Sequence, residues 1–207
     1  MSPEFSSPVA QVEAPVWRRA APSSTNLPLI DEHTASNEVR LLFAQYRERF
    51  ARTDLPAIVQ CFATNAVLLR CMLEIAERFL FGESLLCRRH KEMIATYISR
   101  QNACPYCADS HGALLAGQGG SLEMIRALQC GDLNAQLFTN AELALLKFAS
   151  KINENALAVT RADMETTTQA GWTEEQVAEA VHISALFAAF NRIANGFGLP
   201  SPYPDRF

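Results

Sequence analysis

The chain has 207 residues, of which 49% are hydrophobic, and it carries a formal net charge of −4 with a pI near 5.6. A chain of this length and apolar content can bury a substantial core within one domain. The acidic balance supplies no positive field, and no Lys/Arg cluster is interleaved with aromatic residues. The composition therefore argues against a nucleic-acid partner.

The N-terminal segment differs in composition from the rest of the chain. Its first 30 residues contain half of all the prolines, with serine runs, and lack the continuous apolar core of a signal peptide. We expect residues 1–30 to form an extended or disordered arm and residues 31–207 to form a single domain. The longest apolar stretch, residues 56–69, is interrupted by polar side chains and is too short to cross a bilayer. These features predict a cytoplasmic protein with no membrane partner.

The first half of that domain shows helical periodicity. Apolar residues recur at intervals of three and four over residues 39–50 and again from Pro56 to near Gly82, which predicts two amphipathic helices. A third helix begins after Ser84 and approaches residue 99. A fourth begins at residue 104 and ends at the glycines from residue 117 onward, and a short fifth follows Ser121.

Later helix starts are marked by pairs of capping residues. Thr139 with Glu142, Thr160 with Asp163, and Thr173 with Gln176 each have the spacing of a capping box, and the last of these helices runs to Gly196. No stretch shows sustained alternation with a period of two. The sequence therefore predicts an all-α domain of seven or eight helices.

The chemistry of the chain centres on Cys104-Pro105-Tyr106-Cys107, with His111 four residues beyond the second cysteine. Two intervening residues allow the two sulfurs to meet across one helical turn and to form and reopen a disulfide. Pro105 suits the first position of a helix, which makes Cys104 the N-cap. Cys107 then lies in the first turn, where the helix dipole stabilises a thiolate, and His111 lies on the same face as a proton acceptor.

Other interpretations of this motif are weaker. The same tetrapeptide occurs in glutaredoxins, but a thioredoxin-like site needs a preceding strand and a downstream cis-proline. Here residues 91–99 continue a helical pattern, and no proline lies between Pro105 and Pro200. Structural zinc needs four ligands, and only Cys130 and His182 remain to complete a set. Inert core thiols are the remaining alternative. We expect no metal and no bound cofactor, and we expect the other four cysteines, at positions 61, 71, 87 and 130, to be small apolar core residues.

Glu92 precedes Cys104 by twelve positions and admits two interpretations. A carboxylate on the preceding helix could approach His111, orient its ring and stabilise the imidazolium. Glu92 also follows Arg88 and Arg89 at helical spacing, as in an ordinary solvated ion pair. Spacing alone favours the solvated pair.

Taken together, Glu92, Cys104, Cys107 and His111 follow the pattern E-x(11)-C-x-x-C-x(3)-H. The chain resembles the alkyl hydroperoxidase D (AhpD)-like, carboxymuconolactone decarboxylase superfamily, and is most similar to its peroxidase-related branch. The resemblance covers roughly residues 40–200, including Phe190-Asn191-Arg192 and Gly198-Leu199-Pro200.

This resemblance implies an all-α AhpD-like fold with a helical hairpin at the CxxC motif, assembled into a homo-oligomer such as a trimer or hexamer. It implies that Cys107 is the peroxidatic thiol, Cys104 the resolving thiol, and His111 with Glu92 a proton relay. Some AhpD proteins carry a histidine between the cysteines where Tyr106 stands here, so a role assigned to that histidine does not transfer.

The resulting prediction is a thiol-dependent peroxidase that reduces an alkyl hydroperoxide or hydrogen peroxide. Its expected reductant is an external dithiol, lipoamide or a thioredoxin-like protein. Two alternatives remain: a redox-responsive oligomeric protein without significant turnover, and a lyase like the decarboxylase members of the superfamily. His182, Phe187 and Phe190 are expected to be core or interface residues.

Overall fold

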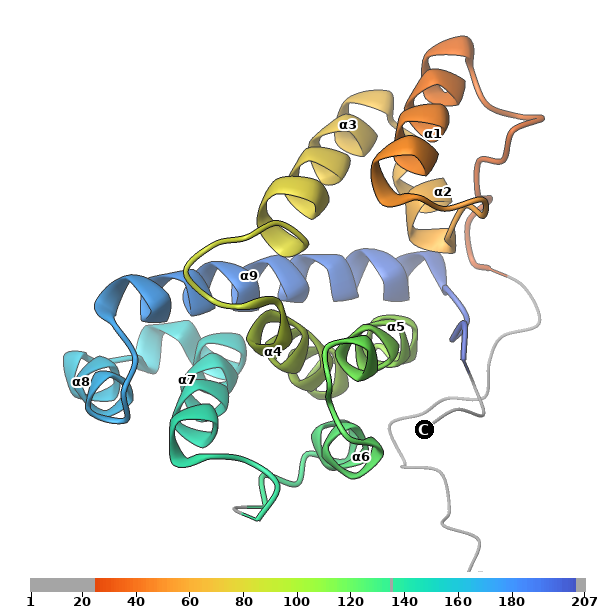
Figure 1. Cartoon of the computed structure of the whole chain (residues 1–207). Helices are drawn as coiled ribbons and strands as arrows, with labels where there is room; N and C mark the ends of the chain where they lie inside the picture. The colour runs from red at the N-terminus through yellow and green to blue at the C-terminus, as the bar shows by residue number, and fades with distance from the viewer. Residues whose placement is uncertain (1–24, 135, 204–207) are drawn as a thin grey trace, which may run out of the picture.

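The computed structural model describes residues 25–134 and 136–203, and all regular structure in these ranges is helical (Figure 1). The all-α prediction is therefore confirmed. These ranges contain nine α-helices with one π-helical and one 3₁₀ segment. Most of the expected N-terminal arm, residues 1–24, lies outside the described ranges, and residues 25–30 contain no helix.

The first three helices are α1 (Asn37–Phe50), α2 (Ala57–Phe62) and α3 (Ala66–Ile75), and α3 continues into a π-helical turn, Ala76–Leu80. The prediction of one helix from residue 56 to residue 82 was wrong. The Asn65 side chain accepts hydrogen bonds from the backbone N–H groups of Val67 and Leu68 and so caps a new helix. An Asn side chain that satisfies free N–H groups in this way ends one helix and begins the next.

The central helix is α4 (Arg88–Gln101), which packs along α5 (Pro105–Gly117) and also contacts α6 (Leu122–Cys130), α7 (Asn140–Asn155) and α9 (Glu174–Phe197). A tight turn joins α4 to α5. Within it Ala103 has a left-handed backbone with φ 48°, a conformation that reverses the chain in few residues. The expected helical hairpin is thus formed by α4 and α5, with the cysteine pair at the start of its second arm.

The C-terminal helices are α7 (Asn140–Asn155), followed by the 3₁₀ segment Ala156–Ala158, then α8 (Arg161–Gln169) and α9 (Glu174–Phe197). All three predicted capping boxes are present, at Thr139, Thr160 and Thr173. Figure 1 shows α9 running across the molecule between α1–α3 and the remaining helices. By length and composition α9 could cross a membrane, but it packs here against α4, α7 and α8 as a core helix.

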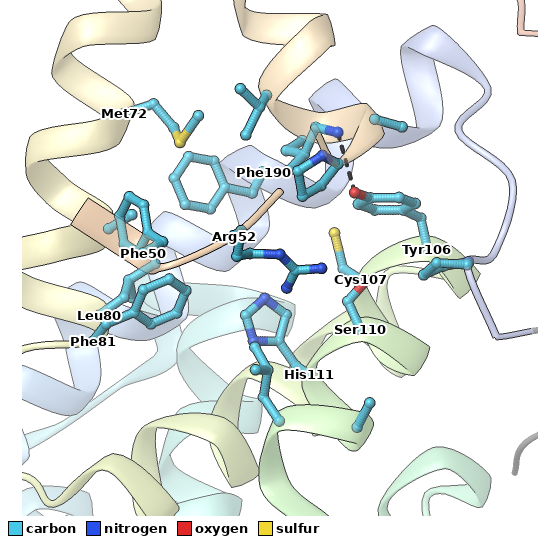
Figure 2. A pocket seen from close by; sticks show the side chains of 18 of the residues that line it. Phe50, Arg52, Met72, Leu80, Phe81, Tyr106, Cys107, Ser110, His111 and Phe190 are labelled. Carbon is cyan, nitrogen blue, oxygen red and sulfur yellow. Dashed lines mark hydrogen bonds between the residues drawn. The ribbon is translucent and has the colours of Figure 1, made fainter. Parts of the chain in front are cut away.

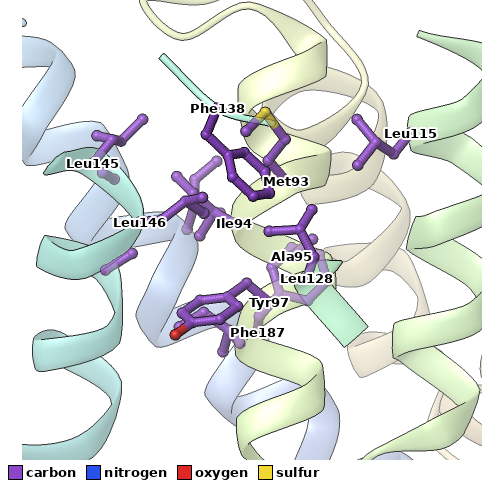
Figure 3. Close-up of a cluster of buried hydrophobic side chains, with 14 of the residues drawn as sticks. Met93, Ile94, Ala95, Tyr97, Leu115, Leu128, Phe138, Leu145, Leu146 and Phe187 are labelled. Carbon is purple, nitrogen blue, oxygen red and sulfur yellow. The ribbon is translucent and has the colours of Figure 1, made fainter. Parts of the chain in front are cut away.

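The core has two main parts. One surrounds α4 and includes Met93, Ile94, Leu128, Leu146 and Phe187 (Figure 3). The other is built by α1, α2 and α3. Phe81 and Phe190 are partly buried and pack against both parts. Aromatic side chains thus join the two parts without filling the space between them, and the candidate site lies in that space.

Candidate active site

The cysteine pair lies at the N-terminus of α5, as the sequence predicts. Cys104 is the N-cap, Pro105 is the first helical residue, and Cys107 lies in the first turn. Both thiols are free in this structure. Cys104 is fully buried, whereas Cys107 is 4% exposed and lines a cavity. Access from the cavity therefore distinguishes the two sulfurs.

The two thiols are coupled electrostatically. The hydrogen bond between them lowers the pKa of Cys104 and outweighs burial, which acts to raise it. The same hydrogen bond, together with burial, raises the pKa of Cys107. In the resting pair Cys104 is therefore the sulfur that ionises more readily, whereas Cys107 is the sulfur that a molecule in the cavity can reach. A pair that shares one proton can react through either sulfur, so access decides which one a peroxide in the cavity meets.

Two asparagines of α9 hold this motif from behind. Asn191 is fully buried and donates to Ser99 Oγ at 2.9 Å, and its amide beside the two thiols contributes to the lowered pKa of Cys104 and partly offsets the raised pKa of Cys107. The Asn195 side chain donates to the backbone carbonyls of Asn102 and Ala103. These contacts tie the strained turn before Cys104 to the longest helix of the fold.

Glu92 and His111 meet across the hairpin. His111 Nδ1 lies 2.6 Å from Glu92 Oε2, and Glu92 is only 2% exposed. Arg88 pairs with the other carboxylate oxygen, and its guanidinium lies 4.0 Å above the centre of the Phe81 ring. The His111 ring also packs edge-on against Phe187. The ion pair that spacing predicts for Glu92 forms with Arg88, but the prediction that it is solvated was wrong, because the carboxylate is buried between an arginine and a histidine.

A cavity of about 630 Å³ opens in front of these groups (Figure 2). Its wall combines the reactive side chains of α5 with apolar side chains from both parts of the core. Cys107, Tyr106 and His111 contribute from α5, and the apolar wall includes Phe50, Met72, Leu80, Phe81, Phe187 and Phe190. Phe187 is thus a core residue, as expected, and it also lines the cavity.

Tyr106 is anchored in one orientation. Its hydroxyl oxygen accepts a hydrogen bond from the backbone N–H of Ile58 at 3.1 Å, which joins α5 to the start of α2. Burial raises the pKa of Tyr106, so the phenol stays protonated at neutral pH. A protonated hydroxyl that accepts this bond can still donate one of its own.

The structure also places residues in the cavity that the sequence did not indicate. Arg52 and Asp54, from the loop after α1, line it, as do Pro202 and Tyr203 near the C-terminus. The Ser201 hydroxyl donates to the buried carboxylate of Asp109 and so holds this C-terminal segment against α5. Neither group has a sequence signal, because each depends on segments distant along the chain.

The remaining polar predictions have mixed outcomes. Cys61 is a buried core residue as predicted, but Cys71, Cys87 and Cys130 are exposed, which corrects that expectation for three cysteines. Cys71 faces outward on α3, and the other two stand at helix ends, where side chains meet solvent. His182 is exposed on α9 and is not part of the cavity wall, so the expectation of a core residue was wrong and an interface role stays a prediction. Within the described residues no group of three or more His, Cys, Asp or Glu side chains is placed to hold a metal ion.

Comparison with solved structures places this architecture among known folds. A peroxidase-related protein from Silicibacter sp. TM1040 superposes with a TM-score of 0.73 at 23% identity, covering 89% of this chain and 95% of that one. An AhpD-core peroxidase-related protein from Ralstonia eutropha JMP134 superposes with a TM-score of 0.76 at 23% identity, covering 86% and 93%. This chain has the AhpD-like fold.

The AhpD-like fold does not by itself specify the reaction. The debrominase Bmp8, solved in complex with 2,3,4-tribromopyrrole, shares it at a TM-score of 0.63 and 15% identity, covering 84% of this chain and 91% of that one. No family model and no curated protein matches the chain. The reaction must therefore be argued from the site.

Proposed function

We propose that this AhpD-like protein is a thiol-dependent peroxidase. The observation that supports it most directly is the buried Glu92–His111 pair beside a cavity that Cys107 also lines. A thiol, a histidine base and a carboxylate that orients the base form the constellation required for an activated sulfur nucleophile. The cavity gives a peroxide access to Cys107, whereas Cys104 is fully buried and does not line the cavity.

In the first step His111 takes the proton of Cys107 as the peroxide approaches, because the raised pKa of Cys107 keeps that proton on the sulfur in the resting pair. With Nδ1–H donated to Glu92, the other ring nitrogen of His111 is free to accept that proton, and the carboxylate stabilises the resulting imidazolium. The thiolate then attacks the nearer oxygen of the hydroperoxide and breaks the O–O bond. Cys107 becomes a sulfenic acid, and the leaving oxygen takes the proton from His111 and departs as an alcohol or, from hydrogen peroxide, as water.

In the second step Cys104 attacks the sulfenic sulfur. A disulfide forms and water leaves, which is consistent with two sulfurs one helical turn apart. An external dithiol then reduces this disulfide and is itself oxidised to a disulfide, which returns both thiols. Dihydrolipoamide and the reduced form of a thioredoxin-like protein are the expected reductants.

One assay tests this function. The reduced protein is mixed with cumene hydroperoxide and dihydrolipoamide, and loss of the peroxide is followed at steady state. We expect sustained consumption by the native protein, none by Cys107→Ser, and a single turnover ending in a sulfenic acid for Cys104→Ser. Full turnover by Cys107→Ser would refute the proposal.

The same assay separates the alternatives. Rapid disulfide formation with negligible cycling would favour a redox-responsive protein whose disulfide alters oligomer contacts. An activity on a lactone or similar small acid that survives replacement of both Cys104 and Cys107 would favour a lyase. We further propose a cytoplasmic homo-oligomer, a trimer or hexamer, to be checked by light scattering. Exposed apolar side chains on α1 and α3, Leu41 and Val67 among them, support association.

A further inference from the structure

Arg52 supplies a cationic group to a cavity whose wall is largely apolar. It follows Ala51, which ends α1 in a left-handed conformation with φ 50°. The backbone N–H of Arg52 donates to the Arg47 carbonyl at 3.1 Å, and the side chain lines the cavity. Figure 2 shows the guanidinium extending into the cavity, toward the side on which Cys107 and His111 lie.

Asp54 fixes the orientation of this guanidinium. Arg52 Nε donates to Asp54 Oδ1 at 2.9 Å and Nη2 donates to Oδ2 at 2.8 Å, so one edge of the guanidinium is engaged by both carboxylate oxygens. These bonds raise the pKa of Arg52, which stays charged at every working pH. The described residues offer no hydrogen-bond partner to Nη1, so the second edge of Arg52 keeps donors for a ligand.

The other arginine on the wall is already committed. Arg88 pairs with Glu92, and its guanidinium covers the Phe81 ring. Beyond these groups the wall offers mostly aromatic and aliphatic side chains. A ligand that fills this space thus meets an apolar surface along most of its length and a fixed hydrogen-bonding cation at Arg52.

We infer that Arg52 is a substrate-binding residue that selects amphipathic organic hydroperoxides bearing a carboxylate, such as hydroperoxides of fatty acids. The hydrocarbon part lies against the apolar wall, and the carboxylate accepts hydrogen bonds from the free edge of Arg52. The hydroperoxide part of this inference rests on the proposed peroxidase function, whereas the preference for a carboxylate does not.

Asp54 does not prevent this binding. Its side chain is 59% exposed, so water and salt screen its repulsion of a second carboxylate. A guanidinium has five N–H donors and can engage carboxylates on two edges at once. A charge-assisted hydrogen bond of this kind corresponds to about a tenfold or greater preference for the acid over its neutral ester.

The test measures binding without turnover. Cys107 is alkylated with iodoacetamide in the presence of decanoate or methyl decanoate, and modification of each cysteine is followed by peptide mass spectrometry. We expect decanoate to protect Cys107 at about tenfold lower concentration than the ester. This preference should disappear in Arg52→Leu and persist in Arg78→Leu, a matched control because Arg78 is 78% exposed and lies outside the cavity.

A second measurement uses hydroperoxides. The native protein is given linoleic acid hydroperoxide and its methyl ester with a dithiol reductant, and the acid-to-ester ratio of kcat/KM is compared between Arg52→Leu and Arg78→Leu. Equal protection by decanoate and its ester, or a preference that Arg52→Leu retains, would overturn the inference. Failure of the native protein to consume either hydroperoxide would refute the peroxidase function, while the alkylation experiment still decides the role of Arg52.

Discussion

Lys91 and Glu92 are consecutive residues of α4, are 1% and 2% exposed, and contact different parts of the structure. Lys91 Nζ donates to the carbonyls of Phe79 and Gly82 at 2.6 and 3.0 Å and lies 3.6 Å from Glu179 Oε1. Glu92 instead contacts Arg88 and His111, and His111 opens onto the cavity. The buried charge of Lys91 is thus bound by backbone carbonyls and an acidic side chain. The buried charge of Glu92 is bound by an arginine and by a titratable histidine ring that lines the cavity.

The contrast shows that burial of a charged side chain does not by itself indicate a catalytic role. A buried charge whose partners are fixed backbone groups stabilises a loop, here the segment after the π-helical turn. A buried charge whose partner can gain and lose a proton in front of a cavity can support chemistry. The five predictions that follow begin with Lys91 and Glu92 on α4 and then extend to a buried thiol and to the turn after α4.

The largest expected effect is on stability, at Lys91. Lys91→Met leaves Glu179 buried without its cation and should reduce the free energy of unfolding by about 3–5 kcal/mol in urea titrations. The double variant with Glu179→Gln should recover much of this loss, and per folded molecule the rate of Cys107 alkylation should not change. A large change in that rate would mean that Lys91 and the site around Glu92 are coupled.

Lys91 also predicts a pH dependence. Burial lowers its pKa from 10.5, so the folded state binds the proton less tightly than the unfolded state. The contribution of Lys91 to stability therefore rises as pH increases from the lowered pKa toward 10.5. Urea titrations across this pH range should show the free energy of unfolding of the native protein rising relative to that of Lys91→Met.

Next in size is the rate effect at Glu92. Glu92→Gln keeps the shape of the side chain but removes the charge that orients and stabilises His111, and should slow the reaction of Cys107 with peroxide about 100-fold in stopped-flow experiments. Glu142→Gln is the matched control, because Glu142 on α7 is also buried and pairs with Arg89, which lies on α4 as Glu92 does. Equal slowing in both variants would assign Glu92 a purely structural role.

Cys61 extends the comparison to a buried group with no counter-charge. Burial raises its pKa from 9.0 to about 12, so the thiol stays protonated when folded and ionises more readily when unfolded. Its contribution to stability is complete below pH 9 and is lost as pH rises toward 12, by about 3 kcal/mol at pH 11. Cys61→Ala should remove this loss in urea titrations at pH 8 and 11, and Cys130→Ala, at an exposed thiol, should not.

The smallest expected effect concerns the turn that joins α4 to the cysteine motif. Ala103→Gly relieves the left-handed backbone at φ 48° and should raise the free energy of unfolding by about 0.5–1 kcal/mol. Ala170→Gly, at a position with φ −76°, should instead lower it. Thermal melts of both variants check the sign, and a loss of stability in Ala103→Gly would show that its methyl group is needed in the turn.

Much of the fold could be predicted from local sequence. Capping boxes at Thr139, Thr160 and Thr173 located three helix starts, and Pro105 located a fourth, because these signals act within one helical turn. The break at Asn65 was missed because apolar periodicity continues across it. Exposure of Cys71, Cys87 and Cys130 was missed because cysteine is usually buried, whereas position on a helix decides the individual case.

For the candidate site the sequence by itself determined the motif: two thiols at the start of a helix, and a histidine one turn beyond. Only the tertiary structure decided that Glu92 is buried against His111, that Cys107 lines the cavity while Cys104 does not, and that Arg52 reaches the same space. The physical reason is the separation along the chain between the residues that interact. Helix caps depend on neighbours three or four residues away, whereas burial, access and the meeting of charges depend on helices that pack together from distant parts of the chain.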